Sequence, residues 1–195
     1  MRAEVLAHLL RLARPEIAGS GEILDDGCGR GWLLRALVEA GVEPERLHGV
    51  DIQPERVAAA RQALPGAEIA VGDSRNLRFP DESFALVFQL TLLSSLGSHR
   101  AIREALGEGM RVLAPGGLLL VYEPRVPNPL NRYTLLIRKN DLRAAGVTPA
   151  EQRSLTVVPA LARRLGERTQ ERYRRLARLP FLRTHRLIAY RKPAA

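Results

Sequence analysis

The chain has 195 residues, 46% of them hydrophobic and 26% charged, and this size and composition predict one globular domain with a single core. No stretch approaches the roughly 20 apolar residues of a membrane span, and the N-terminus does not resemble a signal peptide. The single cysteine, Cys28, excludes an internal disulfide. We therefore expect a cytoplasmic protein without a membrane partner. The net charge of +9 is uneven, because the segment from Pro159 to the C-terminus holds eleven basic and two acidic residues, whereas the rest is balanced.

Hydrophobic periodicity and turn residues predict alternating helices and strands. In chain order these are helix 4–14, strand 22–26, helix 31–40, strand 47–50, helix 55–64, strands 68–71 and 84–88, helix 99–113, strand 118–122, helix 139–145, strand 152–158, helix 159–178 and strand 182–190. The alternation predicts an α/β fold with a mostly parallel sheet and helices on both faces. A proline-rich stretch, residues 123–138, interrupts it and is a predicted loop.

Three glycines at alternate positions follow the first predicted strand. Gly27, Gly29 and Gly31 allow a sharp turn and close approach of a ligand to the backbone, and the helix behind them points free N–H groups at the turn. The spacing differs from the dinucleotide fingerprint G-x-G-x-x-G, because Trp32 occupies the third small position. This argues against a nicotinamide cofactor without excluding one.

Acidic residues stand at the ends of the first three predicted strands: Asp25, Asp51 and Asp73. Ligands of open α/β sheets lie at the carboxyl ends of the strands, and an acid about twenty residues beyond the glycine turn suits ribose hydroxyls. A single such residue often caps a turn instead. Three of them beside a glycine turn favour ligand binding.

These segments together resemble the class I methyltransferases that depend on S-adenosylmethionine (SAM). The resemblance spans about residues 20–125 and rests on residues 23–31 (ILDDGCGRG), 49–54 (GVDIQP), 72–74 (GDS), 83–87 (SFALV) and 111–117 (RVLAPGG). It implies a Rossmann-like, three-layer fold with a seven-stranded sheet in which the seventh strand is antiparallel, between the fifth and sixth. It also implies the cofactor SAM, with S-adenosylhomocysteine (SAH) as product.

The resemblance further implies which residues hold the cofactor. These are Asp25, Gly27, Cys28, Gly29 and Gly31 for the methionine part, Asp51 and Ile52 for the ribose and adenine, Asp73 and Ser74 for the adenine edge, and Gln89 near the sulfonium. Two residues depart from the family pattern. Asp26 replaces an apolar residue, and we expect it to face solvent or to pair with an arginine such as Arg30. Trp32 is expected to pack at the mouth of the site.

The catalytic residues are not identified by the sequence. Glu123 and His99 are weak candidates for a general base. For His99 we prefer a solvent-exposed side chain at the start of a helix, and we expect His185 to be structural. The substrate side is predicted to include Arg125, Asn128 and Tyr133, and no metal site is expected. A base is optional in methyl transfer, because the acceptor can already be ionised.

We therefore expect a single domain, 1–195, that methylates a small molecule. Within it, residues 1–19 form an N-terminal helix, 20–125 the SAM-binding half, and 126–195 a lid loop and a substrate-side half. Three alternatives stay open: an RNA methyltransferase that uses the basic C-terminal segment, a protein that binds SAM without turnover, and an NAD-dependent oxidoreductase. The acceptor and the oligomeric state are not predicted.

Overall fold

The computed structural model describes residues 2–127, 134–157 and 183–194. The helices in this part of the chain are α1 (Arg2–Leu12), α2 (Arg14–Ala18), α3 (Trp32–Glu39), α4 (Pro54–Ala63), α5 (His99–Val112) and α6 (Lys139–Ala144), with the 3₁₀ helices η1 (Pro44–Arg46) and η2 (Leu93–Ser95). The strands are β1 (Ile23–Asp26), β2 (Leu47–Asp51), β3 (Glu68–Val71), β4 (Phe84–Leu90), β5 (Leu113–Pro124), β6 (Glu151–Val157) and β7 (Arg183–Arg191). The predicted helix over residues 159–178 lies outside the described residues.

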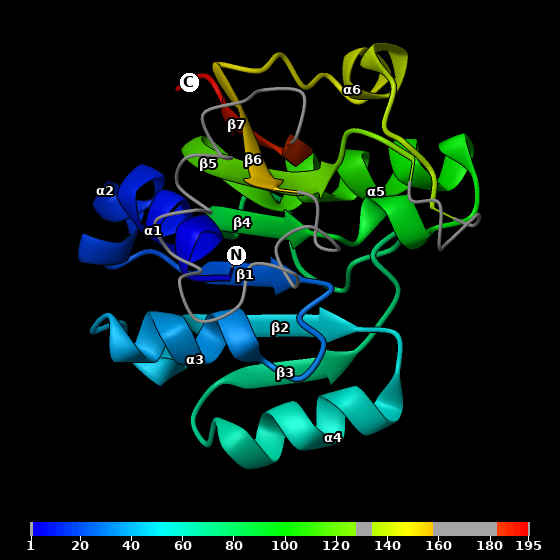
Figure 1. Ribbon diagram of the computed structural model, residues 1–195. Helices are drawn as coiled ribbons and strands as arrows, with labels where there is room; N and C mark the ends of the chain where they lie inside the picture. The colour runs from blue at the N-terminus through cyan, green and yellow to red at the C-terminus, as the bar shows by residue number, and fades with distance from the viewer. Residues whose placement is uncertain (1, 128–133, 158–182, 195) are drawn as a thin grey trace, which may run out of the picture.

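The seven strands form one sheet in the order β3-β2-β1-β4-β5-β7-β6 (Figure 1). Strands β1 to β5 are parallel, whereas β7 runs antiparallel between β5 and β6. The predicted fold, including the antiparallel seventh strand, is therefore confirmed. Since the strand order reverses direction between β1 and β4, a crevice for a ligand is expected above their carboxyl ends.

Alternate strand residues face two hydrophobic cores, one on each side of the sheet. Ile23 and Leu47 pack with side chains of α1, α3 and α4 on one side. Leu24, Val50 and Val87 pack with α5 and α6 on the other. A parallel sheet buried on both faces explains why the strands read as almost continuous apolar runs.

Local sequence signals explain where the helices near the crevice begin. α3 starts directly after Gly31, whose φ of 73° lies in the left-handed region. α4 starts at Pro54, whose missing N–H costs nothing in the first helical turn. α5 is capped by Ser98, whose side-chain oxygen accepts a hydrogen bond from the Ala101 N–H at 3.1 Å.

Two predicted boundaries were wrong. The N-terminal helix is two helices, because Pro15 occupies the first turn of α2 instead of ending the segment. β1 ends at Asp26 and β3 at Val71, as predicted, but Asp25 and Asp73 are not the last residues of these strands, because Asp25 lies inside β1 and Asp73 lies beyond β3. β5 begins at Leu113, before the Pro-Gly-Gly turn, with an irregular register against β4.

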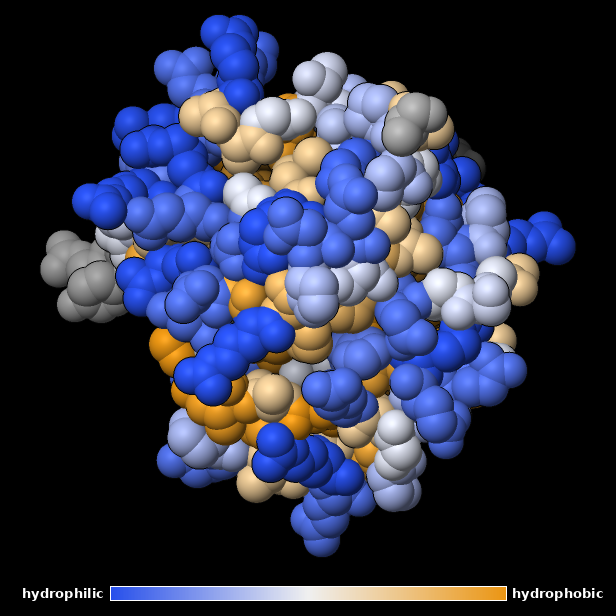
Figure 2. All heavy atoms as spheres, turned by 180° about the vertical axis from the view of Figure 1, so that it is seen from behind, coloured by the Kyte–Doolittle hydropathy of each residue, from blue (hydrophilic) through white to orange (hydrophobic). Residues whose placement is uncertain are grey.

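Hydrophilic side chains cover most of the face shown in Figure 2, and hydrophobic surface gathers in its lower part. Among the described residues, the large hydrophobic side chains that are exposed are Ile52 and Val71, at the ends of β2 and β3. No helix in the described ranges has the length and apolar character needed to cross a bilayer.

Candidate functional site

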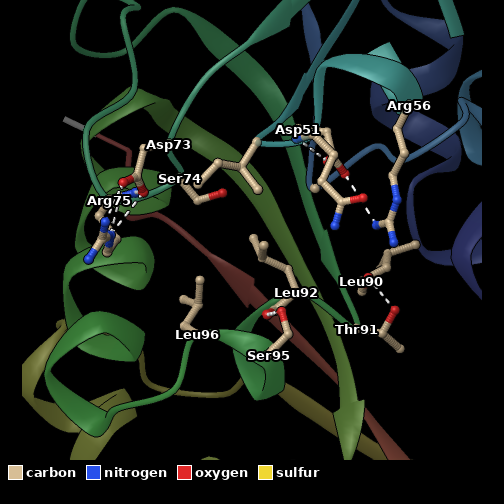
Figure 3. A pocket seen from close by; sticks show the side chains of 13 residues that line it. Asp51, Arg56, Asp73, Ser74, Arg75, Leu90, Thr91, Leu92, Ser95 and Leu96 are labelled. Atoms are coloured by element: carbon tan, nitrogen blue, oxygen red, sulfur yellow. Dashed lines mark hydrogen bonds and ion pairs between the residues drawn. The ribbon is translucent and has the colours of Figure 1, made fainter. Parts of the chain in front are cut away.

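A cavity of about 460 Å³ opens at the carboxyl ends of β2 and β4 and beside the loop that follows β3 (Figure 3). Its lining residues are Gly27, Asp51, Ile52, Gln53, Arg56, Asp73, Ser74, Arg75, Leu90, Thr91, Leu92, Ser95 and Leu96. Asp51 and Asp73 line one part of the cavity, each beside an arginine, and leucines with two hydroxyl side chains line the part that follows β4. Five of the predicted cofactor residues meet here: Gly27, Asp51, Ile52, Asp73 and Ser74.

The glycine turn is fixed to the end of β2 by its own backbone. The N–H groups of Gly27 and Cys28 both donate to the Val50 carbonyl, at 2.8 and 2.9 Å. The φ values of Gly27, Gly29 and Gly31 are 86°, 55° and 73°. All three are left-handed, so a side chain at any of them is strained.

The three glycines differ in what a side chain would meet. A Cβ on Gly29 would point into open space, whereas one on Gly31 would lie 2.9 Å from Leu64 and 3.3 Å from Ala60. Gly31 is therefore needed for the packing of the turn against α4, and it does not line the cavity. Of these three glycines, only Gly29 combines a left-handed backbone with open space where a side chain would stand.

Asp51 is held with both oxygens in place at the end of β2. Its Oδ2 accepts from the Gly29 N–H at 3.0 Å and its Oδ1 accepts from the Gln53 N–H at 2.9 Å. The Arg56 guanidinium lies 3.9 Å from Oδ2. Each carboxylate oxygen has two lone pairs, so both can accept one further hydrogen bond from a ligand.

Ile52 and the Asp73–Arg75 pair lie beyond Asp51 along the cavity. Ile52 is 64% exposed and offers a flat apolar contact. Asp73 accepts from Arg75 Nε at 3.0 Å on both oxygens and from Arg75 Nη2 at 2.5 Å. The Arg75 guanidinium holds the pKa of Asp73 below its usual value.

The comparisons with known proteins agree with this geometry. A family described as a methyltransferase domain matches residues 23–117. The demethylmenaquinone methyltransferase of Chlorobaculum parvum is 34% identical over 132 residues, which are 64% of this chain and 51% of that protein. Residues 23–117 belong to the methyltransferase domain family, and the comparisons support a class I, Rossmann-like SAM-dependent methyltransferase.

Solved structures extend the similarity of this chain to methyltransferases. SAM-bound CalS10, an amino pentose methyltransferase from Micromonospora echinaspora, is 30% identical with a TM-score of 0.52, covering 66% of this chain and 51% of that chain. The N-methyltransferase NodS from Bradyrhizobium japonicum WM9 has a TM-score of 0.71 at 18% identity, covering 98% and 96% of the two chains, which shows a shared fold. The chain spans about half the length of the curated relatives it matches.

Two further predicted cofactor residues are buried and do not line the cavity. Asp25 is 3% exposed, and burial, reinforced by Asp26 and Asp51, raises its pKa to about 8. Cys28 packs its side chain toward Gly49, and burial, with the nearby carboxylates, raises the pKa of its thiol. A neutral, buried thiol is a packing group and no nucleophile at neutral pH.

Gln89 and Asp26 were placed wrongly by the sequence. Gln89 lies within β4, is fully buried, and donates to Asp26 Oδ2 at 3.0 Å and to the Ala105 carbonyl at 2.8 Å, so it does not face the cavity. Asp26 is also fully buried, and its partners are Gln89 and Ser74 instead of solvent or an arginine. Trp32 packs against the core on the α1 side and does not line the cavity.

The weak candidates for a general base have other partners. Glu123 is fully buried and accepts from the N–H groups of Leu93 and Ser94 at 2.7 and 3.2 Å, so it caps η2 and does not point to the cavity mouth. Burial raises its pKa to about 7. His99 begins α5 but is not a solvated side chain, because its Nδ1 lies 2.8 Å from Asp141.

The predicted substrate side is only partly within the described residues. Arg125 follows β5, and its guanidinium donates to the Ser154 hydroxyl at 2.9 Å outside the cavity lining. Asn128 and Tyr133 lie outside the described residues, as does most of the basic C-terminal segment. His185 stacks on Tyr122 with ring centroids 4.9 Å apart, as expected of a structural residue.

Several residues that line the cavity were not predicted from the sequence, because they belong to no recognised motif. Arg56 and Arg75 follow Asp51 and Asp73 by five and two positions, and a charge-pair search along the chain could have found them. Thr91, Leu92, Ser95 and Leu96 follow β4 and carry no local signal. Thr91 is unusual, because it is β-branched and yet has a φ of 55°. Among the described residues, no group of three or more His, Cys, Asp or Glu side chains is placed to hold a metal ion.

Proposed function

We propose that this protein transfers the methyl group of SAM to a small-molecule acceptor. The observation that carries the proposal is the pairing of Asp51 and Ile52 at the end of β2. The two Asp51 oxygens are fixed by backbone N–H groups and retain lone pairs, beside an apolar side chain that is 64% exposed. An acceptor of two hydrogen bonds beside an exposed apolar surface suits a ribose diol joined to a purine.

The residues of the cavity fit the cofactor along its length. Asp51 would accept from the ribose hydroxyls, Ile52 would contact the adenine face, and the turn at Gly27 and Gly29 would lie beside the amino-acid part. Asp25 lies outside the lining, and burial with the charges of Asp26 and Asp51 raises its pKa to about 8, so a cationic group beside it would favour its ionised form. An incoming ammonium would supply the positive charge that these carboxylates lack.

The cofactor supplies a methyl group on a sulfonium, which an acceptor displaces in line. This chain therefore contributes position and exclusion of water, which are the main requirements of such a reaction. Leu90, Leu92 and Leu96 line the part of the cavity after β4 and would keep water from the reacting atoms. The hydroxyls of Thr91 and Ser95 donate to the carbonyls of Leu90 and Leu92, so toward a ligand they can only accept.

A small-molecule acceptor is supported by the relatives, whose names give a demethylmenaquinone and an amino pentose as acceptors. The described cavity wall after β4 carries no charged side chain and consists of leucines with the hydroxyl side chains of Thr91 and Ser95. The alternative of an RNA acceptor depends on the basic segment from Pro159 onward, of which residues 159–182 lie outside the described residues. No described contact favours it.

The direct test is transfer of a labelled methyl group from SAM to a panel of small molecules, including a demethylmenaquinone and an amino sugar. We expect acceptor-dependent release of SAH by the wild type and at least a tenfold lower rate with Asp51→Ala at subsaturating SAM, because that variant loses ribose contacts. SAM binding without transfer to any acceptor would favour the non-catalytic alternative. NAD binding without SAM binding would select the oxidoreductase alternative.

A further inference from the structure

Asp26 is a buried carboxyl group that the family resemblance does not explain. It is fully buried at the end of β1, where the family carries an apolar residue. Its Oδ1 accepts from the Ser74 hydroxyl at 2.5 Å, and its Oδ2 accepts from Gln89 Nε2 at 3.0 Å. Buried charges are costly unless hydrogen-bonded, so a carboxyl kept here needs a reason beyond packing.

The direction of the Ser74 hydrogen bond follows from the chemistry of its partner. An ionised carboxylate can only accept, so the Ser74 hydroxyl must donate to Asp26. The hydroxyl has one hydrogen, and after donating it Ser74 presents only lone pairs to the cavity that it lines. Asp26 therefore fixes this point of the wall as a hydrogen-bond acceptor.

The other acceptor at this end of the cavity is already occupied. Both oxygens of Asp73 accept from the Arg75 side chain, and Oδ1 also accepts from the Arg75 N–H at 2.9 Å. Ser74 is thus the acceptor with free lone pairs closest along the chain to Asp73, and it lines the same cavity as Ile52.

We propose that Asp26 is a positioning residue that holds Ser74 as the acceptor for an exocyclic amino group, so that the site selects an adenine base over hypoxanthine. This inference rests on the proposed function, because it assumes that the nucleoside lies along Ile52. Adenine presents an amino donor where hypoxanthine presents a carbonyl oxygen. A carbonyl would face the Ser74 lone pairs with no hydrogen between them, which costs a hydrogen bond and leaves polar atoms unpaired.

The surroundings of Asp26 give the selection a dependence on pH. Burial raises its pKa to about 6, the hydrogen bonds from Ser74 and Gln89 oppose this, and the charges of Asp73 and Asp51 raise it further. Asp25 is the titratable neighbour on the same strand, and on the α5 side the Ala105 carbonyl accepts a hydrogen bond from Gln89, whose amide also donates to Asp26. Below about pH 6 the carboxyl gains a proton, can donate to Ser74, and frees the hydroxyl to donate to a ligand.

The experiment compares SAH with S-inosylhomocysteine, its hypoxanthine analogue, by titration calorimetry at pH 8. We expect the wild type to bind SAH at least tenfold more tightly than the analogue. In Asp26→Asn the side-chain amide can donate to Ser74, and in Ser74→Ala the acceptor is removed, so both variants should lose most of this ratio. Ser83→Ala is the matched control, because its hydroxyl donates to the Pro80 carbonyl outside the cavity and its ratio should equal that of the wild type.

Folding is checked for each variant by thermal melting, and Ser74→Ala carries the test alone if Asp26→Asn does not fold. A wild-type ratio that falls between pH 8 and pH 5, and that is flat in Asp26→Asn, supports the inference. Retention of the full ratio by folded Asp26→Asn or by Ser74→Ala would overturn it while leaving SAH binding intact. Absence of SAH binding by the wild type would instead overturn the proposed function itself.

Discussion

At the scale of single residues, Asp51 is the side chain on which the proposed ligand site depends most. It joins the glycine turn to the end of β2 through the Gly29 N–H and is 7% exposed at the cavity. Replacing Asp51 by Ala should weaken SAH binding by about 1–3 kcal/mol, because ribose hydroxyls would lose their acceptors. Calorimetry measures this, with Asp81→Ala as control, since the Asp81 side chain is 74% exposed and pairs with Arg111. An unchanged dissociation constant for Asp51→Ala would contradict the placement of the nucleoside.

Gly29 offers a second test at this scale. Its φ of 55° strains any side chain, and a Cβ there points into open space. We expect Gly29→Val to abolish SAH binding while circular dichroism still shows the native fold. Gly116→Val is the matched control, because Gly116 also has a φ of 75° and open space around it, but its N–H donates to the Lys192 carbonyl, whereas that of Gly29 donates to the cavity residue Asp51. Full binding by Gly29→Val would mean that the turn does not contact the ligand.

The sequence predicted which residues stand near the site better than where their side chains point. Asp51 and Ile52 were predicted to line it, because they end a strand that the motif fixes. Gln89 and Glu123 were misplaced, because the direction of a side chain depends on strand pairing and on what packs above it, as η2 does on Glu123. Asp26 could not be understood alone, since its partners Ser74 and Gln89 are distant in sequence.

At the scale of elements, Asp141 joins α6 to α5. It is almost fully buried and accepts from the Arg138 N–H at 2.9 Å and from Arg103 at 3.1 Å, while His99 lies 2.8 Å away. Burial raises the pKa of Asp141, but these hydrogen bonds outweigh it and hold the pKa below the usual 3.8. A carboxyl whose pKa is lower in the folded than in the unfolded state stabilises the folded state at pH values above the unfolded pKa. This stabilisation is lost as the pH falls through the folded pKa.

We therefore expect Asp141→Asn to reduce the free energy of unfolding by about 2 kcal/mol at pH 7, the contribution of hydrogen bonds to a charged group. The difference from the wild type should begin to shrink below about pH 4 and disappear as the pH falls through the lowered folded-state pKa of Asp141, where the wild-type carboxyl also becomes neutral. Urea denaturation at pH 7 and pH 3.5 measures both. Glu151→Gln, at an exposed ion pair on β6, should change stability by less than about 0.5 kcal/mol. A difference that does not depend on pH would show that the charge of Asp141 contributes nothing.

The elements were predicted well where periodicity was strong and less well where proline was present. Pro15 was taken as a stop but starts α2, and the Pro-Gly-Gly turn before residue 118 proved to lie within β5. In both places proline is compatible with either structure, and tertiary packing decides between them.

At the scale of the whole molecule, the order of the strands positions the site. From the centre of the sheet, β1, β2 and β3 follow one another in one direction, and β4 and β5 follow in the other. The loops after β1 to β3 and the loops after β4 and β5 therefore lie on opposite sides of the boundary between β1 and β4. The family resemblance predicted the antiparallel seventh strand between the fifth and sixth, whereas periodicity alone predicted only a mostly parallel sheet. The acceptor was not predictable, because it depends on side chains that carry no motif, such as Leu92 and Leu96.

The central claim is tested most directly by a crystal structure of the protein soaked with SAH. We predict that the ribose hydroxyls lie within hydrogen-bond distance of Asp51 and that the adenine contacts Ile52 and the Ser74 hydroxyl. A molecule of SAH bound to another surface, or a cavity that stays without SAH at saturating concentration, would contradict the account.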